Sequence, residues 1–344
     1  MNDLDRYKKQ ILVPYIGNQG QASLLTAKCA IVGIGALGST VAEQLVRAGV
    51  GFIRIIDRDY VEVSNLQRQT LYTEEDASKG TPKAIAAKER LGQINQSIVI
   101  EPVIAHLHSG NIERLLSDVE LIIDATDNFT TRYLINEYSV ANKTPWIHGA
   151  VVSTHGRVVN FIPGQTPCFQ CLFPVKPTLA NIDTCDTVGV LAPIVQIIGS
   201  IQAMEAIKWL THQSDALSDK LIQYDVWQHS LLKFDIAHSK QKECPICAKH
   251  QYEELSKPYE EVNDAVLCGR NTVQIAYSFH HEQHKSIILN RLAAKYKVIQ
   301  NKYVTKIQYD ENMQLTLFHD GRCLVHGTNQ IEEAKSLAAK LFND

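Results

Sequence analysis

The sequence predicts an α/β protein with a Rossmann-like, mostly parallel sheet that continues into antiparallel strands and is followed by a small C-terminal α+β module. Over the first half of the chain, short apolar runs alternate with helical segments. A glycine-rich turn joins the first of these runs to the first helix. Further along, apolar runs follow one another with no helix between them, which is typical of antiparallel pairs.

The first strand–helix–strand unit starts with the apolar run 29–32 and the glycine-rich turn 33–38. A helix is expected over 39–48, and a second strand over 52–56 ends at Asp57. The right-handed crossover of such a unit makes its two strands parallel. The same alternation predicts helices at 82–94, 110–116 and 128–141, and strands at 97–102, 121–125, 146–151 and 157–162.

The pattern changes after residue 161. Residues 173–187 combine proline, threonine and aspartate with little periodicity, which predicts a long loop of the kind that is often functional. An uncharged run, 187–204, follows, and then strands are expected at 221–226 and 230–234. Because the uncharged run contains two glycines, a proline and two glutamines, we expect a buried or subunit-interface helix and no membrane span.

We divide the chain into a nucleotide-binding domain over 1–250, an acidic linker over 251–263 and a small α+β module over 264–344. The sequence does not indicate the role of this module. Its expected strands lie near 272–276, 303–309, 314–318 and 323–326, and its expected helices near 286–295 and 330–342.

The composition limits the class of protein. With 34 Lys and Arg against 37 Asp and Glu, the net charge is −3, and 45% of the 344 residues are hydrophobic. These values exclude wholesale disorder and a general nucleic-acid coat, which would need a basic excess. The first residues, Met-Asn-Asp-Leu-Asp-Arg, are too acidic and polar for a signal peptide. We therefore expect a cytoplasmic protein that binds neither nucleic acid nor membrane.

Gly33, Gly35 and Gly38 form a GxGxxG turn that follows a strand and opens a helix. Asp57 comes 19 residues after Gly38, at the end of the next strand. In this context the glycines allow close backbone approach to phosphate, helix N–H groups meet the phosphate, and the acid binds ribose hydroxyls. The turn therefore predicts nucleotide binding but does not say which nucleotide.

Two cations that follow Asp57, Arg68 and Lys83, favour a triphosphate over a nicotinamide dinucleotide, because phosphate oxygens need guanidinium and ammonium donors. Asp127 lies just beyond a strand end, where one carboxylate can hold Mg²⁺. Taken singly, each of these residues also fits a surface ion pair or a helix cap. Asp127 in particular would suit the cap of the helix that begins near Asn128.

Four of the eight cysteines form two CxxC pairs, Cys168 with Cys171 and Cys244 with Cys247. In a chain without a secretory signal, two such pairs predict a four-thiolate Zn²⁺ site. With all four positions filled by protein, the zinc would be structural. The alternative is a pair of redox dithiols or chance CxxC pairs.

These motifs together resemble the ubiquitin-activating-like adenylyltransferases, in particular the bacterial enzymes of the molybdopterin and thiamine pathways. The resemblance covers roughly residues 5–248. It rests on Arg6–Ile11, Gly33–Gly38, Asp57-Arg58-Asp59, Ser64–Gln69, Pro82-Lys83, Ala125–Asn128 and the two CxxC pairs.

The resemblance implies a set of roles for the nucleotide site. Asp57 would hold the ribose of ATP, and Asp127 would position Mg²⁺. Phosphate contacts fall to Asn65, Arg68 and Lys83. The remaining residues assigned to the nucleotide pocket through the matching motifs are Gly33, Gly35, Gly38, Asp59 and Asn128.

Two positions set this chain apart. Family members usually carry arginine where this chain has Lys9, and that residue reaches into the partner subunit's ATP site. Lys9 keeps the charge but loses the bidentate fork. Cys185 lies on the long loop where relatives place a conjugating or sulfur-relay thiol. Its neighbours Asp183 and Asp186 would raise the pKa of a thiol, which argues against a highly reactive thiolate.

The resemblance implies a homodimer that adenylates the C-terminal Gly-Gly carboxylate of a small ubiquitin-like sulfur-carrier protein and releases pyrophosphate. We place molybdopterin synthesis first and the thiamine carrier second. A sulfurtransferase or cysteine desulfurase is a further candidate partner. Two alternatives of another class are an NAD-dependent oxidoreductase and a non-catalytic scaffold for a ubiquitin-like protein. The first would leave Arg68, Lys83 and Asp127 unexplained, and only Lys9 supports the second.

Overall fold

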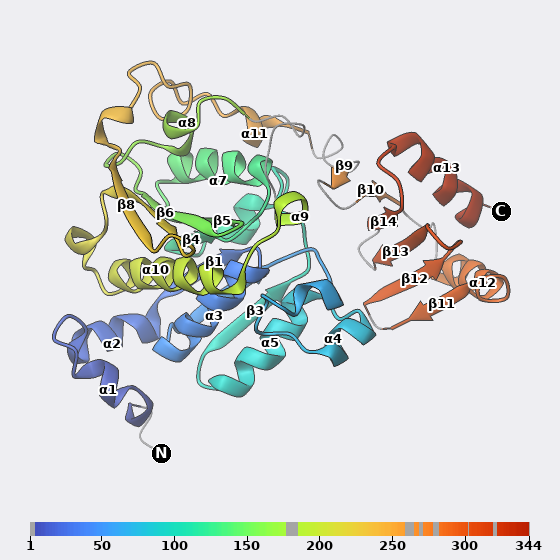
Figure 1. Ribbon diagram of the computed structural model, residues 1–344, viewed down its shortest axis with the longest axis horizontal. Helices are drawn as coiled ribbons and strands as arrows, with labels where there is room; N and C mark the ends of the chain where they lie inside the picture. The colour runs from blue at the N-terminus through green and yellow to red at the C-terminus, as the bar shows by residue number, and fades with distance from the viewer. Residues whose placement is uncertain are drawn as a thin grey trace. The chain divides into compact units, whose positions relative to one another are not determined.

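The computed structural model describes residues 4–176, 185–258, 265–267, 271–277, 282–301, 303–318 and 322–343. The chain divides into two compact units, Met1–Lys257 and Pro258–Asp344. Each unit has its own β-sheet (Figure 1).

The first unit is built on a sheet of eight strands in the order β3-β2-β1-β4-β5-β6-β7-β8. The five strands from β3 to β5 are parallel, and β6, β7 and β8 continue the sheet antiparallel. This arrangement confirms the fold class expected from the sequence. The strands are β1 (Lys28–Val32), β2 (Phe52–Ile56), β3 (Val99–Val103), β4 (Leu121–Asp124), β5 (Trp146–Val152), β6 (His155–Phe161), β7 (Lys220–Asp225) and β8 (Ser230–Asp235).

Helices cover both faces of this sheet (Figure 1). On one face, α3, α5 and α10 contribute to a core that includes Ile31, Ile53 and Ile123. On the other, α6, α7 and α8 pack over Trp146 and Phe161. The helices are α1 (Lys8–Ile11), α2 (Gly17–Thr26), α3 (Ala36–Ala48), α4 (Glu74–Lys79), α5 (Lys83–Ile94), α6 (Ile112–Leu116), α7 (Phe129–Asn142), α8 (Phe169–Leu172), α9 (Cys185–Val188), α10 (Ala192–Leu210) and α11 (Glu253–Ser256).

The ends of the helices follow local chemistry. Helix α3 ends at Gly49, whose φ of 87° lies in the left-handed region that glycine adopts without strain. Helix α4 starts with a capping box in which Thr73 and Asp76 exchange hydrogen bonds. Neither α4 nor α2 was expected from the sequence, because their short, largely polar segments show no clear apolar stripe.

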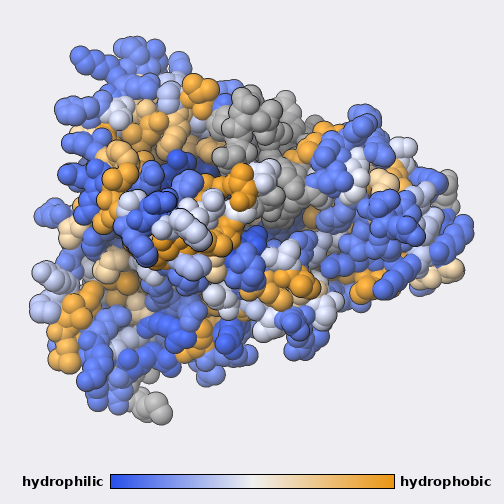
Figure 2. Space-filling model, viewed as in Figure 1, coloured by the Kyte–Doolittle hydropathy of each residue, from blue (hydrophilic) through white to orange (hydrophobic). Residues whose placement is uncertain are grey.

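Helix α10 contains most of the uncharged run noted in the sequence and continues to Leu210. It is apolar around most of its circumference because it packs on α3 and on strands β4 to β7. Within the described ranges, no helix combines the length and apolar character that crossing a bilayer requires. Figure 2 shows that hydrophobic residues on the face in view form separate patches among hydrophilic ones.

The second unit has a six-stranded antiparallel sheet in the order β11-β12-β13-β14-β10-β9. Helices α12 and α13 share a core with it that includes Ile307, Leu315 and Val325. The elements are β9 (Ala265–Leu267), β10 (Thr272–Ala276), α12 (Glu282–Ala293), β11 (Lys297–Gln300), β12 (Val304–Gln308), β13 (Gln314–Phe318), β14 (Arg322–His326) and α13 (Ile331–Phe342). Strands β9 and β11, each of three or four residues, were too short to recognise in the sequence.

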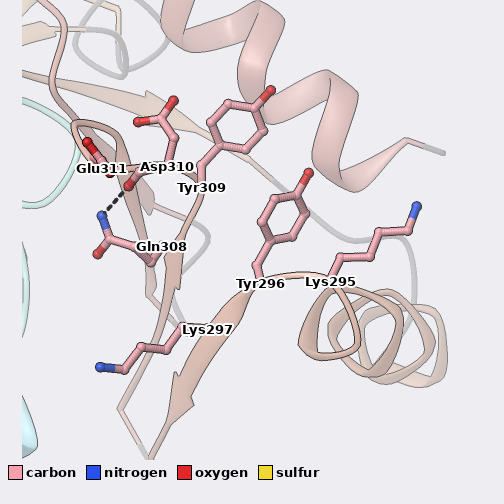
Figure 3. Close-up of a pocket in the computed structure, with 7 residues that line it drawn as sticks. All are labelled: Lys295, Tyr296, Lys297, Gln308, Tyr309, Asp310 and Glu311. Atoms are coloured by element: carbon pink, nitrogen blue, oxygen red, sulfur yellow. Dashed lines mark hydrogen bonds between the residues drawn. The ribbon is translucent and has the colours of Figure 1, made fainter.

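An open hollow of about 580 Å³ lies on the second unit at the β11–β12 edge (Figure 3). The rings of Tyr296 and Tyr309 stand side by side there, with centroids 5.5 Å apart. Lys340 donates a hydrogen bond of 2.7 Å to the Tyr309 hydroxyl. None of the motifs singled out in the sequence contributes to this hollow.

Gly38 is required by packing, and its replacement should destabilise the first unit. A Cβ at this position would lie 2.0 Å from the carbonyl oxygen of Gly33. We expect Gly38→Ala to lower the free energy of unfolding by about 3 kcal/mol, measured by urea denaturation. Gly92→Ala is the matched control, because a Cβ there meets nothing within 4 Å and the residue lies inside α5. The control should be neutral or stabilising by up to about 1 kcal/mol. Equal stability of the two variants would contradict the packing argument.

Candidate active site

The candidate site lies at the carboxyl edge of the parallel strands. Val32, Ile56 and Asp124 are in register across β1, β2 and β4, so the three strands end together. The segments that follow them are the glycine-rich turn, Asp57 and the turn that carries Asp127. Strand β2 lies on one side of β1 and β4 on the other, so the strand order reverses at β1. The carboxyl edge at such a topological switch point is where α/β proteins bind ligands.

Backbone contacts within the protein explain why two of the three positions must be glycine. Gly33 has a φ of +86°, and a Cβ there would lie 2.8 Å from the carbonyl oxygen of Ala125. Gly38 closes the same turn from the helix side. Gly35 differs, because among described residues a Cβ at this position would meet only Gln69 Nε2, at an ordinary 3.7 Å. Packing therefore does not demand glycine at position 35, whereas close approach of a phosphate to the backbone would.

Asp57 ties the end of β2 to the glycine-rich turn. Its Oδ2 accepts the Ile34 N–H at 2.8 Å, and its Oδ1 accepts the Asp59 N–H at 2.7 Å. Burial raises the pKa of this carboxyl above its usual value, Asp59 adds to the rise, and Lys83 and the two N–H groups oppose it. A carboxylate has about four lone-pair positions, so two remain for ribose hydroxyls.

Lys83 is a buried cation held beside Asp57. It starts α5 directly after Pro82, and its side chain is only 4% exposed. Its Nζ lies 3.2 Å from Asp59 Oδ2, and its backbone N–H donates to the Asp59 carbonyl at 2.8 Å. The structure thus brings Asp57, Asp59 and Lys83 into one group, although Lys83 follows Asp59 by 24 residues in the sequence.

Asn65 and Arg68 belong to the turn after Asp59. Asn65 is buried, and its Oδ1 accepts the Glu62 N–H at 3.2 Å. Arg68 is partly exposed, and its Nη1 donates to the Ser64 carbonyl at 2.9 Å. Both side chains therefore stabilise the local turn. Gln69, which the sequence analysis did not single out, is 4% exposed and lies next to Gly35.

Asp127 is exposed on the turn between β4 and α7. The cap of α7 is its neighbour Asn128, whose Oδ1 accepts the Thr131 N–H at 3.3 Å. The alternative role of Asp127 as helix cap is therefore wrong, because Asn128 occupies the N-cap position. This leaves the Mg²⁺ role of Asp127 as a prediction.

A buried polar cluster beneath this turn was missed by the sequence analysis. Asp124 Oδ1 accepts both the backbone N–H and the hydroxyl of Thr126, at 3.0 and 2.7 Å. Its Oδ2 accepts from His148 Nδ1 at 2.7 Å and lies 3.5 Å from Arg132 Nε. Arg132 Nη2 also donates to the Thr126 carbonyl at 2.5 Å. The available signal was an aspartate and a histidine at matching places in two apolar strand segments, 121–125 and 146–151.

In this cluster the histidine is neutral and the aspartate is ionised at pH 7. Burial lowers the pKa of His148 to about 4, against the pull of Asp124, so the imidazole is neutral at pH 7. Burial acts to raise the pKa of Asp124, but the His148 hydrogen bond and Arg132 outweigh it and the net shift is downward. Asp124 is therefore an ionised carboxylate that fixes the turn from below.

The buried neutral His148 predicts a pH-dependent stability. An unfolded histidine takes up a proton near pH 6.5, whereas folded His148 does so only near pH 4. Stability should therefore fall by about 3 kcal/mol on acidification between these values, because the unfolded state binds the extra proton. His148→Gln should flatten the curve in this window, measured by urea denaturation at each pH. The exposed His238→Gln is the control, and a slope unchanged in His148→Gln would contradict the assignment.

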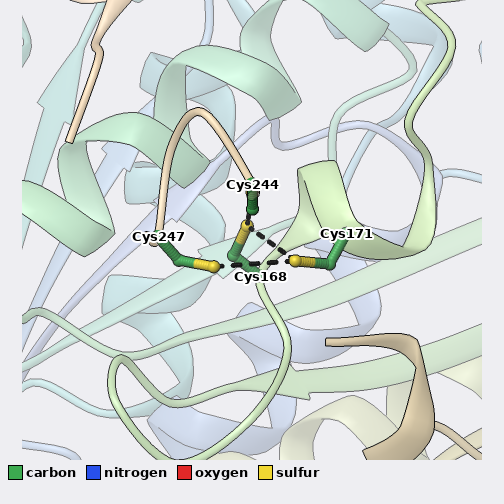
Figure 4. A group of neighbouring side chains, drawn as sticks. All are labelled: Cys168, Cys171, Cys244 and Cys247. Atoms are coloured by element: carbon green, nitrogen blue, oxygen red, sulfur yellow. Dashed lines mark hydrogen bonds between the residues drawn. The ribbon is translucent and has the colours of Figure 1, made fainter. Parts of the chain in front are cut away.

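The four CxxC cysteines come together in space (Figure 4). Cys168 Sγ lies 3.7 Å from Cys244 Sγ, and Cys171 Sγ lies 3.6 Å from Cys247 Sγ. All four sulfurs lie within 4.8 Å of one another. A tetrahedral Zn²⁺ with sulfurs at about 2.3 Å needs about 3.8 Å between them, so the cluster fits such an ion. It would fasten α8 and its N-cap residue to the segment after β8.

Loss of one thiol should remove the metal and loosen this fastening. We expect about one zinc per purified chain and a large loss of zinc in Cys247→Ser, measured by elemental analysis. The melting temperature should fall in parallel. Cys323→Ala, in the second unit, is the matched control and should keep its zinc. A metal-free wild-type protein with reactive dithiols would instead support the redox alternative.

Two predicted site residues stay without a structural test. Lys9 is exposed on α1, and its role in a partner subunit's site stays a prediction. Cys185 begins α9, but its side chain lies outside the described part of the structure, as do residues 177–184 of the predicted loop.

This chain is similar in sequence to a known family and to characterised relatives. The ThiF family pattern matches residues 7–246. The chain is 41% identical over 337 residues to the sulfur carrier protein ThiS adenylyltransferase of Bacillus subtilis, covering 97% of this chain and 98% of that protein. It is 37% identical over 272 residues to the sulfur carrier protein adenylyltransferase of Thermus thermophilus, covering 78% and 97%.

Among solved structures, E. coli MccB with ATP superposes with a TM-score of 0.62 at 22% identity, covering 70% of this chain and 74% of MccB. That similarity concerns the fold alone. Fold, site and relatives define an adenylyltransferase on a Rossmann-like sheet. The chain belongs to the ThiF family, which confirms the resemblance noted in its motifs.

Proposed function

We propose that this enzyme uses Mg-ATP to adenylate the C-terminal carboxylate of a small ubiquitin-like sulfur carrier that ends in Gly-Gly. The observation that carries the proposal is the group at the strand edge: a glycine turn open at Gly35, with Asp57 and buried Lys83 beside it. This group suits a nucleotide with several phosphates. The protein substrate is supported by the relatives, which are named as sulfur carrier adenylyltransferases.

In the proposed reaction a carboxylate oxygen of the carrier attacks the α-phosphorus of ATP. The new O–P bond forms as the bond to the pyrophosphate oxygen breaks, and pyrophosphate leaves. The carboxylate is already ionised at neutral pH, so no general base is needed. The barrier is largely repulsion between anions, and the residues lower it by neutralising charge and aligning the reactants.

Each site residue has one task in this scheme. Asp57 accepts from the ribose hydroxyls, and Lys83 and Arg68 bind phosphate oxygens. Asp127, exposed at the same edge, would hold Mg²⁺, which supplies charge neutralisation to the phosphates. Lys9 from a second subunit would complete the site in a homodimer. Helix α10 leaves Met204 43% exposed, which suits an apolar subunit contact.

For the identity of the carrier, we now put the thiamine-pathway protein first, ahead of the molybdopterin carrier favoured by the sequence analysis. The match to the Bacillus subtilis enzyme runs through the second unit and covers 98% of that protein. The match to the Dictyostelium discoideum adenylyltransferase and sulfurtransferase MOCS3 covers only 72% of this chain and 57% of that protein. Because this chain and the Bacillus enzyme match through the second unit, we favour the carrier that the name of the Bacillus enzyme gives.

The proposal is tested by measuring ATP–pyrophosphate exchange with each purified carrier separately. We expect exchange that depends on the carrier and is strongest with a thiamine-type carrier. Exchange only with a molybdopterin-type carrier would reverse the order of the two pathways. No exchange with any Gly-Gly carrier would refute the proposed function.

The same assay tests Asp127, the residue proposed to hold Mg²⁺. Asp127→Ala should reduce exchange by about a hundredfold or more while leaving the melting temperature unchanged, because the side chain is exposed. Asp219→Ala removes another exposed carboxylate and should have wild-type activity. Near-normal exchange by Asp127→Ala would show that the Mg²⁺ assignment is wrong.

A further inference from the structure

Arg157 on β6 has one buried side-chain nitrogen, Nε, that is without a hydrogen-bond partner in the described part of the chain. The contact that the side chain does make is with the ring of Phe173, whose centroid lies 4.7 Å from Cζ. An N–H donor that is buried without an acceptor loses its hydrogen bond to water and gains nothing in return, so an acceptor that reached Nε would stabilise the site. A charged donor of this kind is well matched by an anionic acceptor.

The neighbouring carboxylate does not supply that anion. Asp124 is already engaged by Thr126, His148 and Arg132, which use both of its oxygens. Burial lowers the pKa of Arg157 to about 10, and Arg132 adds to the decrease, while Asp124 opposes it. Arg157 therefore remains a cation at neutral pH. Together with Arg132 it makes this corner of the site positive.

The position of Arg157 separates it from the phosphates. It pairs with Ala150 near the carboxyl end of β5, so it lies at the same edge of the sheet as Asp127. The order β1-β4-β5-β6 places β6 three strands from the glycine-rich turn, or roughly 14 Å at the usual strand spacing. Asp127 follows β4, between the two. A nucleotide bound at the glycine turn thus lies on one side of Asp127, and Arg157 lies on the other.

We propose that Arg157 binds the terminal carboxylate of the protein substrate and holds it on the side of Asp127 opposite the nucleotide. This inference rests on the proposed function. The planar guanidinium matches a carboxylate with two parallel hydrogen bonds. The same contact reduces the repulsion between carboxylate and triphosphate as the two approach. When the carboxylate oxygen forms its bond to phosphorus, pyrophosphate departs with its electron pair, and Arg157 keeps its proton throughout.

Two other roles for Arg157 make different predictions. A contact with the phosphates of ATP would change the KM for ATP. A purely structural role, stacking on Phe173, would change the melting temperature but neither KM. A carboxylate contact should instead act on the carrier alone.

The test measures ATP–pyrophosphate exchange of Arg157→Gln as a function of carrier and of ATP concentration. We expect the KM for the carrier to rise about tenfold to a hundredfold, as for loss of a charged hydrogen bond, with the KM for ATP within about twofold of wild type. Arg157→Lys should give a smaller rise, because it keeps the charge but not the fork. Arg90→Gln, an exposed position on α5, is the matched control and should behave as wild type.

A second measurement uses the unaltered enzyme, so it does not depend on the folding of any variant. The wild-type protein should bind a carrier with a free C-terminal carboxylate about tenfold more tightly than the same carrier with an amidated terminus, and Arg157→Gln should lose this preference. Equal binding of both carriers by the wild type, or a KM change for ATP alone, would overturn the inference. Carrier-dependent exchange that Arg157→Gln leaves unchanged would also overturn it while leaving the proposed function intact. No exchange by the wild-type enzyme would refute the proposed function and this inference together.

Discussion

The site depends on one backbone contact, in which the glycine-rich turn lies directly against the turn that follows β4. A side chain at Gly33 would lie 2.8 Å from the carbonyl oxygen of Ala125, so only glycine permits the approach. Hydrogen bonds from Gly33 N to the Ile56 carbonyl and from Ala125 N to the Val32 carbonyl, at 2.8 and 2.9 Å, hold the three strand ends together. This contact brings the residues proposed to bind phosphate and those proposed to bind Mg²⁺ to one edge of the sheet.

Buried carboxylates then hold the turns at this edge in position through hydrogen bonds and an ion pair. On the nucleotide side, Asp57 bonds the glycine turn, and Asp59 holds Lys83. On the other side, Asp124 supports the turn of Asp127 from below through Thr126. Both groups use carboxylates that accept hydrogen bonds from neighbouring N–H or O–H groups, which lowers the cost of burying them. Arg157 has no carboxylate at hydrogen-bond distance of its buried Nε among the described residues, and this donor is what points to a ligand.

The sequence predicted a large part of this arrangement because its signals are local. Strand β2 has the bounds expected from its apolar run, and α5 begins within one residue of the expected start. The two CxxC pairs also predicted their own clustering, since four thiolates with this spacing suit one ion. Local reasoning failed for the cap of α7, where the sequence analysis offered Asp127 and the backbone geometry places Asn128 at the N-cap.

The sequence by itself determined the fold class, the glycine-rich turn, the family and the clustering of the four CxxC thiols, because glycine spacing, apolar periodicity and CxxC spacing are properties of short segments. Only the tertiary structure decided which polar residues are buried and whether each is satisfied. Asp124, His148 and Arg157 come from three different strands. Their contacts, and the lack of a described partner for Arg157 Nε, appear in no window of the sequence. The physical reason is that the cost of an unpaired charge depends on burial, which long-range packing creates.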